Sequence, residues 1–100
     1  MLNIDLKNEG GNVTIVLDGM LDTNTSAEFK DRLNEIPNNA TKVTVDMEKL
    51  KYTSSAGLRV ILGLQNEMDK NKTELVFCNV NEVIQEVFDD TGFSDFIKVE

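Results

Sequence analysis

Two hydrophobic periodicities alternate along this chain of 100 residues, and their order constrains the fold more than any other feature. Apolar residues fall at every second position in 2–6 and again in 13–17, which predicts two strands. The intervening segment KNEGGN contains Gly10 and Gly11, which readily adopt positive φ, so the two strands are expected to form a hairpin. Further strands are predicted at 42–47 and at 73–80. The last of these contains the continuous apolar run LVFC, which is typical of a central strand covered on both faces.

A second spacing, close to 3.6 residues, predicts the helices. In the first helix, Phe29, Leu33 and Ile36 share one face, and Pro37 follows as a terminator. Thr25 has capping-box spacing to Glu28, which predicts that this helix begins near Thr25.

Two more helices are expected later in the chain. The second should span 55–68, with an apolar stripe through Ile61, Leu64 and Met68. The third should begin near Asn79, which has capping-box spacing to Glu82, and should continue to about residue 88.

The resulting order is β-β-α-β-α-β-α-(β), where the bracket stands for a short closing strand at Ile97 and Val99. This order predicts an α/β fold with a small mixed sheet of four or five strands, parallel in its later part and packed with α-helices. We expect one domain over residues 1–100. In such sheets the functional edge usually lies at the carboxyl ends of the strands, where DMEKLKYTSSAG leads from a strand into the second helix.

Composition excludes several function classes. The formal net charge of −8 disfavours nucleic acid and anionic membrane surfaces as partners. The chain has no histidine, which removes Ser–His and Cys–His nucleophile pairs and the usual nitrogen ligand of zinc. We therefore expect no enzyme activity, no cofactor and no metal site. Neither a basic-then-apolar leader nor an apolar run of membrane-spanning length occurs, so a cytoplasmic location is expected.

The segment Ser54, Ser55, Ala56, Gly57 at the start of the second predicted helix is the main candidate site. A serine there can cap the helix, and the free N–H groups of a helix start also favour a phosphate. The two roles are compatible, since one serine can cap while the other is modified. Glycine in the first turn lowers helix stability, so Gly57 predicts close approach, either by the sheet below or by a partner above.

These residues also carry a resemblance to a known family. The stretch VTVDMEKLKYTSSAGLRVILGL, the earlier GMLD at 19–22 and a closing Gly-Phe, Asp-Phe and Lys pattern at 92–98 resemble the STAS domain of anti-sigma factor antagonists. The resemblance covers nearly the whole chain. Registered on Gly57 and Leu58, it places the phosphorylated serine of the family at Ser55. Ser54, the runner-up for this role, stands where the family often has aspartate.

The resemblance implies a partner switch. An unphosphorylated antagonist binds an anti-sigma factor that is also a serine kinase, phosphorylation releases it, and a PP2C-type phosphatase resets it. Asp22 and Asp46 match acidic positions that the resemblance places near the acceptor, although an Asp after a strand also commonly begins a turn. The expected docking surface is completed by residues at the start of the second helix: Ser54, Ser55, Ala56, Gly57 and Arg59. A lone surface arginine such as Arg59 is more often simply solvated.

An alternative interpretation belongs to a different class. A STAS module that is not phosphorylated would bind a small ligand, such as a nucleotide or lipid phosphate, at the start of the second helix, or would support a larger assembly. The sequence around the serines has no glycine-rich phosphate loop and few lysines, which disfavours the ligand.

Overall fold

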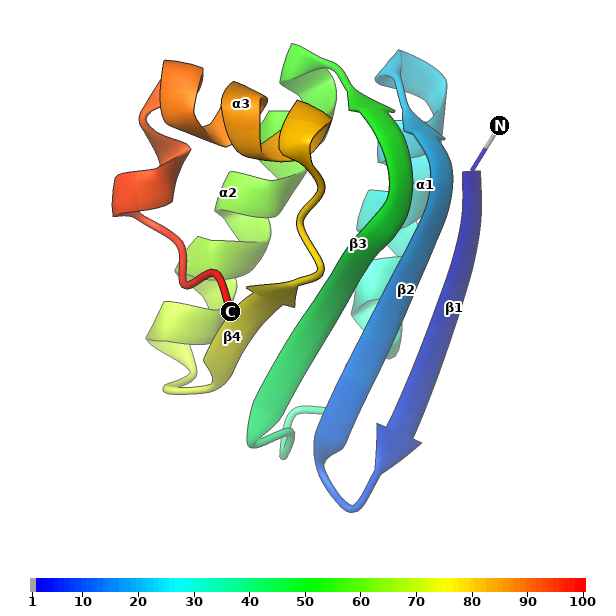
Figure 1. Cartoon of the computed structure of the whole chain (residues 1–100). Helices are drawn as coiled ribbons and strands as arrows, with labels where there is room; N and C mark the ends of the chain where they lie inside the picture. The colour runs from blue at the N-terminus through cyan, green and yellow to red at the C-terminus, as the bar shows by residue number, and fades with distance from the viewer. Residues whose placement is uncertain (1) are drawn as a thin grey trace.

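A computed structural model describes residues 2–100 of the chain. It contains one mixed sheet with the strand order β1-β2-β3-β4 and three α-helices, which confirms the predicted α/β fold (Figure 1). The strands are β1 (Leu2–Glu9), β2 (Asn12–Leu21), β3 (Lys42–Thr53) and β4 (Glu74–Cys78). The α-helices are α1 (Thr23–Arg32), α2 (Ser55–Lys70) and α3 (Glu82–Thr91), and short 3-10 turns occupy Leu33–Glu35 and Phe93–Asp95.

The opening hairpin forms as the glycine pair predicts. β1 and β2 are antiparallel, and Gly10 (φ 59°) and Gly11 (φ 93°) occupy the two turn positions between them. Two successive residues with positive φ are what a tight two-residue hairpin requires. From β2 onward the sheet is parallel, because β2 pairs with β3 and β3 with β4 in the same direction.

α1 and α2 lie side by side against one face of the sheet, behind it in the view of Figure 1. They cover the continuous apolar core to which the strands contribute Val13, Ile15, Leu17, Val43 and Val45. Because each helix follows a parallel strand, both begin at the same end of the sheet, the end to which β2 and β3 point. That end is the one expected to carry the functional site.

α3 lies beside the part of β3 that β4 does not reach. β4 ends at Cys78, which pairs with Asp46, whereas β3 continues to Thr53. Asn81, the N-cap of α3, accepts a hydrogen bond from the Ile84 amide (3.1 Å) and donates one to the Leu50 carbonyl (2.8 Å). This side chain therefore joins the start of α3 to an edge of β3 that lacks a neighbouring strand.

The expectation that the strand at 73–80 is central is wrong. β4 is the last strand in the sheet, although Leu75, Val76 and Phe77 are buried. Its outer edge is partly covered by the C-terminal segment, where Phe77 exchanges two backbone hydrogen bonds of 2.9 Å with Lys98 and Glu100. The predicted closing strand is thus a single bridge between Phe77 and Val99.

Two helix starts differ from their predicted positions. α1 begins earlier than predicted, because Asp22 is its N-cap and Thr25 serves as the third helical residue of the capping box. It ends at Arg32, and the chain continues as a 3-10 turn, so that Ile36 lies outside the helix. α3 is capped by Asn81 and not by Asn79, whose φ of 54° lies in the left-handed region.

Within residues 2–100, the structure has no helix whose length and hydropathy suit a membrane span.

Candidate functional site

The starts of α1 and α2 are joined directly. The Ser54 amide donates a hydrogen bond of 2.8 Å to the carbonyl of Leu21, the last residue of β2. The turn from β2 into α1 and the turn from β3 into α2 therefore meet at one end of the molecule, at the top of Figure 1. This contact brings Asp22, the residue after Leu21, close to the two serines.

The two adjacent serines have different structural roles. Ser54 is the N-cap of α2, and its hydroxyl accepts a hydrogen bond of 3.2 Å from the Gly57 amide. Ser55 is the first helical residue and is exposed, and its side chain makes no hydrogen bond to any residue that the structure describes. The cap is therefore provided by Ser54, which leaves the hydroxyl of Ser55 accessible for chemistry.

Gly57 is buried in the first turn of α2, directly above the sheet. A Cβ atom at this position would collide with the Thr53 hydroxyl and with the side chain of Leu21. The close approach that this glycine predicts is thus to the sheet. Gly57 presents little surface to a partner, and its contribution to a docking surface is to hold Ser55 and Ala56 close to the strands.

Asp22 caps α1 at the edge of the site. Its carboxylate accepts a hydrogen bond of 2.9 Å from the Thr25 amide, and the Thr25 hydroxyl donates to the Met20 carbonyl at 2.7 Å. The hydrogen bonds from the Thr25 backbone and side chain lower the pKa of Asp22 below its ordinary value, because they favour the charged carboxylate. Asp22 is therefore ionised at neutral pH and fixed in orientation.

Asp46 lies away from the serines, so the expectation that it stands near the acceptor is wrong. Asp46 pairs with Val16, whereas Thr53 pairs with Leu21, five residues further along β2. At the rise of an extended strand this separation is about 16 Å. Asp46 instead accepts hydrogen bonds from the Glu48 amide (3.0 Å) and the Asn79 side chain (3.2 Å).

The misplacement of Asp46 has a local cause. The strand predicted at 42–47 continues to Thr53 through two irregularities in its register with β2. These shifts replace the alternating burial of the strand with a three-residue spacing, in which Met47, Leu50 and Thr53 are buried. The alternation that predicts this strand stops at Met47, so the pattern does not indicate its second half.

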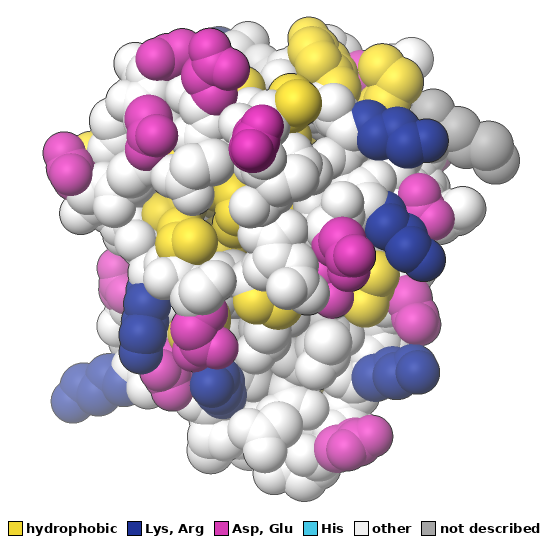
Figure 2. Space-filling view, viewed as in Figure 1, with side chains coloured by type: hydrophobic (Ala, Val, Ile, Leu, Met, Phe, Trp, Pro, Cys, Tyr) yellow, Lys and Arg dark blue, Asp and Glu magenta, His cyan; other side chains and the backbone are white. Residues whose placement is uncertain are grey.

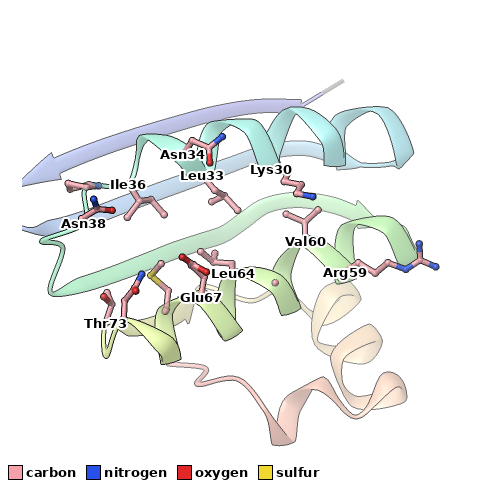
Figure 3. Close-up of a pocket in the computed structure, with 14 residues that line it drawn as sticks. Lys30, Leu33, Asn34, Ile36, Asn38, Arg59, Val60, Leu64, Glu67 and Thr73 are labelled. Carbon is pink, nitrogen blue, oxygen red and sulfur yellow. The ribbon is translucent and has the colours of Figure 1, made fainter.

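Ala56 is half-buried, and Arg59 is exposed one helical turn beyond Ser55. Arg59 lies at one end of a groove of about 540 Å³ between α1 and α2, and Figure 3 shows its side chain pointing away from the groove floor. Lys30 reaches toward α2 at the same end of this groove (Figure 3).

The comparison with protein families decides the classification. The family model for the STAS domain matches residues 3–100. The chain belongs to the STAS domain family. This finding confirms the resemblance that the SSAGL segment and the flanking strands carry.

Two curated relatives of this STAS domain are named as antagonists. It is 29% identical over 90 residues to the putative anti-sigma factor antagonist BtrV of Bordetella bronchiseptica, covering 89% of this chain and 78% of that protein. It is 27% identical over 99 residues to the anti-sigma-B factor antagonist of Staphylococcus aureus, covering 98% of this chain and 92% of that protein.

A solved STAS structure shows the same fold. The anti-sigma factor antagonist SpoIIAA of Bacillus in its unphosphorylated form superposes with a TM-score of 0.82 at 19% identity, over 98% of this chain and 88% of that chain. The phosphorylated form superposes with a TM-score of 0.76 at the same identity, over 98% and 91% of the two chains.

Sequence reasoning missed two large side chains at the site of this STAS domain. Met20 and Tyr52 are neighbours across β2 and β3, and they are 43% and 46% exposed. Figure 2 shows hydrophobic side chains at the end of the molecule where these strands finish. Met20 stands in the quoted segment GMLD and Tyr52 immediately precedes TSSAGL, so an apolar residue beside each helix start was the available signal.

Proposed function

We propose that this protein is an anti-sigma factor antagonist that works as a partner switch, with Ser55 as its phosphorylated residue. In the unphosphorylated state it binds an anti-sigma factor that is also a serine kinase. Phosphorylation of Ser55 releases the complex, and a PP2C-type phosphatase restores the binding state. The protein is the substrate and ligand of these enzymes, acts in the cytoplasm and has no catalytic activity of its own.

The observation that carries this proposal is the division of roles between the serines. The hydroxyl of Ser54 already accepts a hydrogen bond from the Gly57 amide, so phosphorylation of Ser54 would disturb the start of α2. Ser55 is exposed at the first helical position and needs no such contact for folding. A kinase can therefore reach Ser55 without unfolding the helix.

The helix start also explains why a phosphate at Ser55 would leave the domain folded. The first N–H groups of a helix have no partner within the helix, and the helix dipole is positive at this end. Both favour an anion. The charge would consequently act at the docking surface and would leave the fold intact.

The surface around Ser55 suits a protein partner. Met20 and Tyr52 provide exposed apolar area beside the serines, and residues of these two types are enriched in interfaces. A phosphate adds nearly two negative charges to a chain whose net charge is already −8. When a partner covers Ser55, these charges must be desolvated on binding, which weakens the complex.

Asp22 completes this docking surface as a fixed, ionised carboxylate next to Ser54. A basic side chain of the partner is the complementary group. Asp46 is the weakest member of the predicted set, because about 16 Å of strand separate it from the serines.

Phosphosite mapping tests the proposal. The purified protein is incubated with ATP and a lysate of its source organism, and its peptides are analysed by mass spectrometry, with Ser54→Ala and Ser55→Ala as matched variants. We expect phosphate on Ser55, lost in Ser55→Ala and retained in Ser54→Ala. Phosphate on Ser54 alone would overturn the assignment of the acceptor.

A second outcome would overturn the switch itself. If neither serine carries phosphate in a lysate that phosphorylates a control substrate, the protein is better described as a STAS module that is not phosphorylated. That module would bind a small ligand or support a larger assembly.

A further inference from the structure

Gly63 is a glycine that the fold does not require. It lies exposed in the middle of α2, and a Cβ atom placed on it would meet no heavy atom within 4 Å. Glycine inside a helix lowers stability by up to about 1 kcal/mol relative to alanine. Gly57, in the same helix, has the packing reason that Gly63 lacks. The surface over Gly63 is therefore open to another backbone, which can approach a glycine more closely than any other residue.

Two opposite charges flank Gly63 at equal distances. Arg59 stands four residues before it and Glu67 four residues after it, so all three lie along one side of α2. Both charged side chains are exposed, and the ion pairs found within residues 2–100 involve neither of them. Along this side of α2, a positive side chain is thus followed by a glycine without a side chain and then by a negative side chain.

The charges of Arg59 and Glu67 are complementary to those of a second, antiparallel copy of α2. A two-fold axis that passes between the Gly63 residues of two copies, and sets their α2 helices antiparallel, places Arg59 of each copy opposite Glu67 of the other. Such an isologous contact forms two identical ion pairs and closes on itself. With glycine at the crossing, the helix axes can approach to the short end of the usual range of about 8–10 Å.

The groove beside α2 supplies apolar surface to the same contact. Arg59, Gly63 and Glu67 all line the groove between α1 and α2. Figure 3 labels Arg59 and Glu67 on α2. In the antiparallel arrangement, the grooves of the two copies face each other. Val60, Leu64 and Leu33 of both copies would line the enclosed space, and Lys30 adds a second cation at the Arg59 end.

We propose that α2 is a self-association surface, on which a second copy of this chain docks antiparallel with the crossing point at Gly63. One helix pair with its groove is small compared with the roughly 1,200 Å² or more that stable interfaces bury, so the dimer is weak and concentration-dependent. The proposal does not depend on phosphorylation, since Ser55 stands eight residues, or about 12 Å, from the crossing point.

Sedimentation equilibrium between about 10 µM and about 1 mM tests the dimer, because weak contacts have dissociation constants in this range. The weight-average mass should rise from the 11.2 kDa of one chain toward twice that value. Gly63→Leu should remain folded by circular dichroism and remain a monomer across the series. A wild-type protein that stays monomeric at the highest concentration would overturn the proposal.

Charge reversal tests the antiparallel geometry. Arg59→Glu and Glu67→Arg should each be monomeric, because each variant faces like charges across the two-fold axis. Mixing the two variants in equal amounts should restore association, since both ion pairs then form with opposite signs. Lys7→Glu and Glu86→Arg make the same charge changes at exposed positions outside α2 and should associate as the wild type does.

Two outcomes of these experiments would contradict the interface. If the mixture stays monomeric while the wild type dimerises, Arg59 and Glu67 do not face each other. If Gly63→Leu dimerises normally, the contact lies elsewhere on the molecule.

Discussion

At the scale of the single residue, the two glycines of α2 differ in their surroundings, because Gly57 is tightly packed and Gly63 faces open space. A methyl group on Gly57 would collide with Thr53 and Leu21. We expect Gly57→Ala to lower the free energy of unfolding by about 1–3 kcal/mol, the usual range for adding a methyl group to a packed site. Urea denaturation at a protein concentration of a few micromolar, well below that expected for self-association, measures this loss.

Gly63→Ala is the matched control, since it makes the same chemical change in the same helix. Its added methyl group meets open space, so the gain in helix propensity should raise the free energy of unfolding by up to about 1 kcal/mol. Equal effects of the two variants would contradict the packing account of Gly57.

The neighbouring serines should also separate in their effects on stability. Removing the hydroxyl of Ser54 removes the cap of α2, and Ser54→Ala should cost about 1 kcal/mol. Ser55→Ala should change stability by less than about 0.5 kcal/mol, the usual range for an exposed position. Thermal unfolding of both variants tests this difference, and a larger loss in Ser55→Ala than in Ser54→Ala would show that the roles are exchanged.

At the scale of the element, the Asn81 side chain joins the start of α3 to β3. Asn81 caps the helix with its oxygen and donates to the Leu50 carbonyl with its nitrogen. The same nitrogen also donates to the Met47 carbonyl at 3.2 Å. Asn81→Ala loses the cap and these hydrogen bonds to β3 and should destabilise the protein by about 2–3 kcal/mol. Asn81→Asp retains the cap oxygen and loses only the donor.

These two variants therefore divide the contribution of Asn81. Asn81→Asp should be intermediate between the wild type and Asn81→Ala when amide hydrogen exchange is followed in α3. If Asn81→Asp is as stable as the wild type, the contact with β3 contributes nothing measurable.

The elements differ in how well their sequence predicts them. The order of strands and helices was predictable, because the two hydrophobic periods differ clearly and glycine marks the hairpin. The helix starts were less predictable. Thr25 and Asn79 have the same spacing to a glutamate as a true capping box, but Asp22 and Asn81 occupy the caps. The capping-box spacing alone does not show which of several nearby polar residues is the N-cap, because the cap position is set by where the preceding strand or loop ends.

The candidate site was predictable to a similar extent. The segment from Ser54 to Gly57 and the position of Asp22 follow from the order of the elements, since parallel strands bring their following helices to one edge. The distance of Asp46 from that edge did not follow, because register shifts conceal the second half of β3 from a pattern of period two. The exposure of Met20 and Tyr52 depends on that same register.

At the scale of the whole molecule, hydrogen-bonded carboxylates should couple stability to pH. The pKa of Asp22 is lowered by hydrogen bonds from Thr25, that of Glu74 by its hydrogen bond and charge pairing with Lys98, and that of Asp89 by hydrogen bonds from Ser94 and Gln85. A pKa that is lower in the folded than in the unfolded chain stabilises the fold at neutral pH. These contributions persist above the ordinary values near 4 and are lost as the pH falls through the lowered values.

The three carboxylates share no hydrogen-bond partner, so their effects should add. In a triple variant with Asp22→Asn, Glu74→Gln and Asp89→Asn, the free energy of unfolding should be lower at pH 7 and should fall less between pH 7 and pH 3. Urea denaturation at both pH values measures the difference. Amide substitutions at Asp5, Glu9 and Glu86 serve as the control, because these side chains make no hydrogen bond or ion pair to the described residues. If both triple variants lose stability in parallel with the wild type as the pH falls, acid destabilisation arises from the charge of the whole molecule and not from these three contacts.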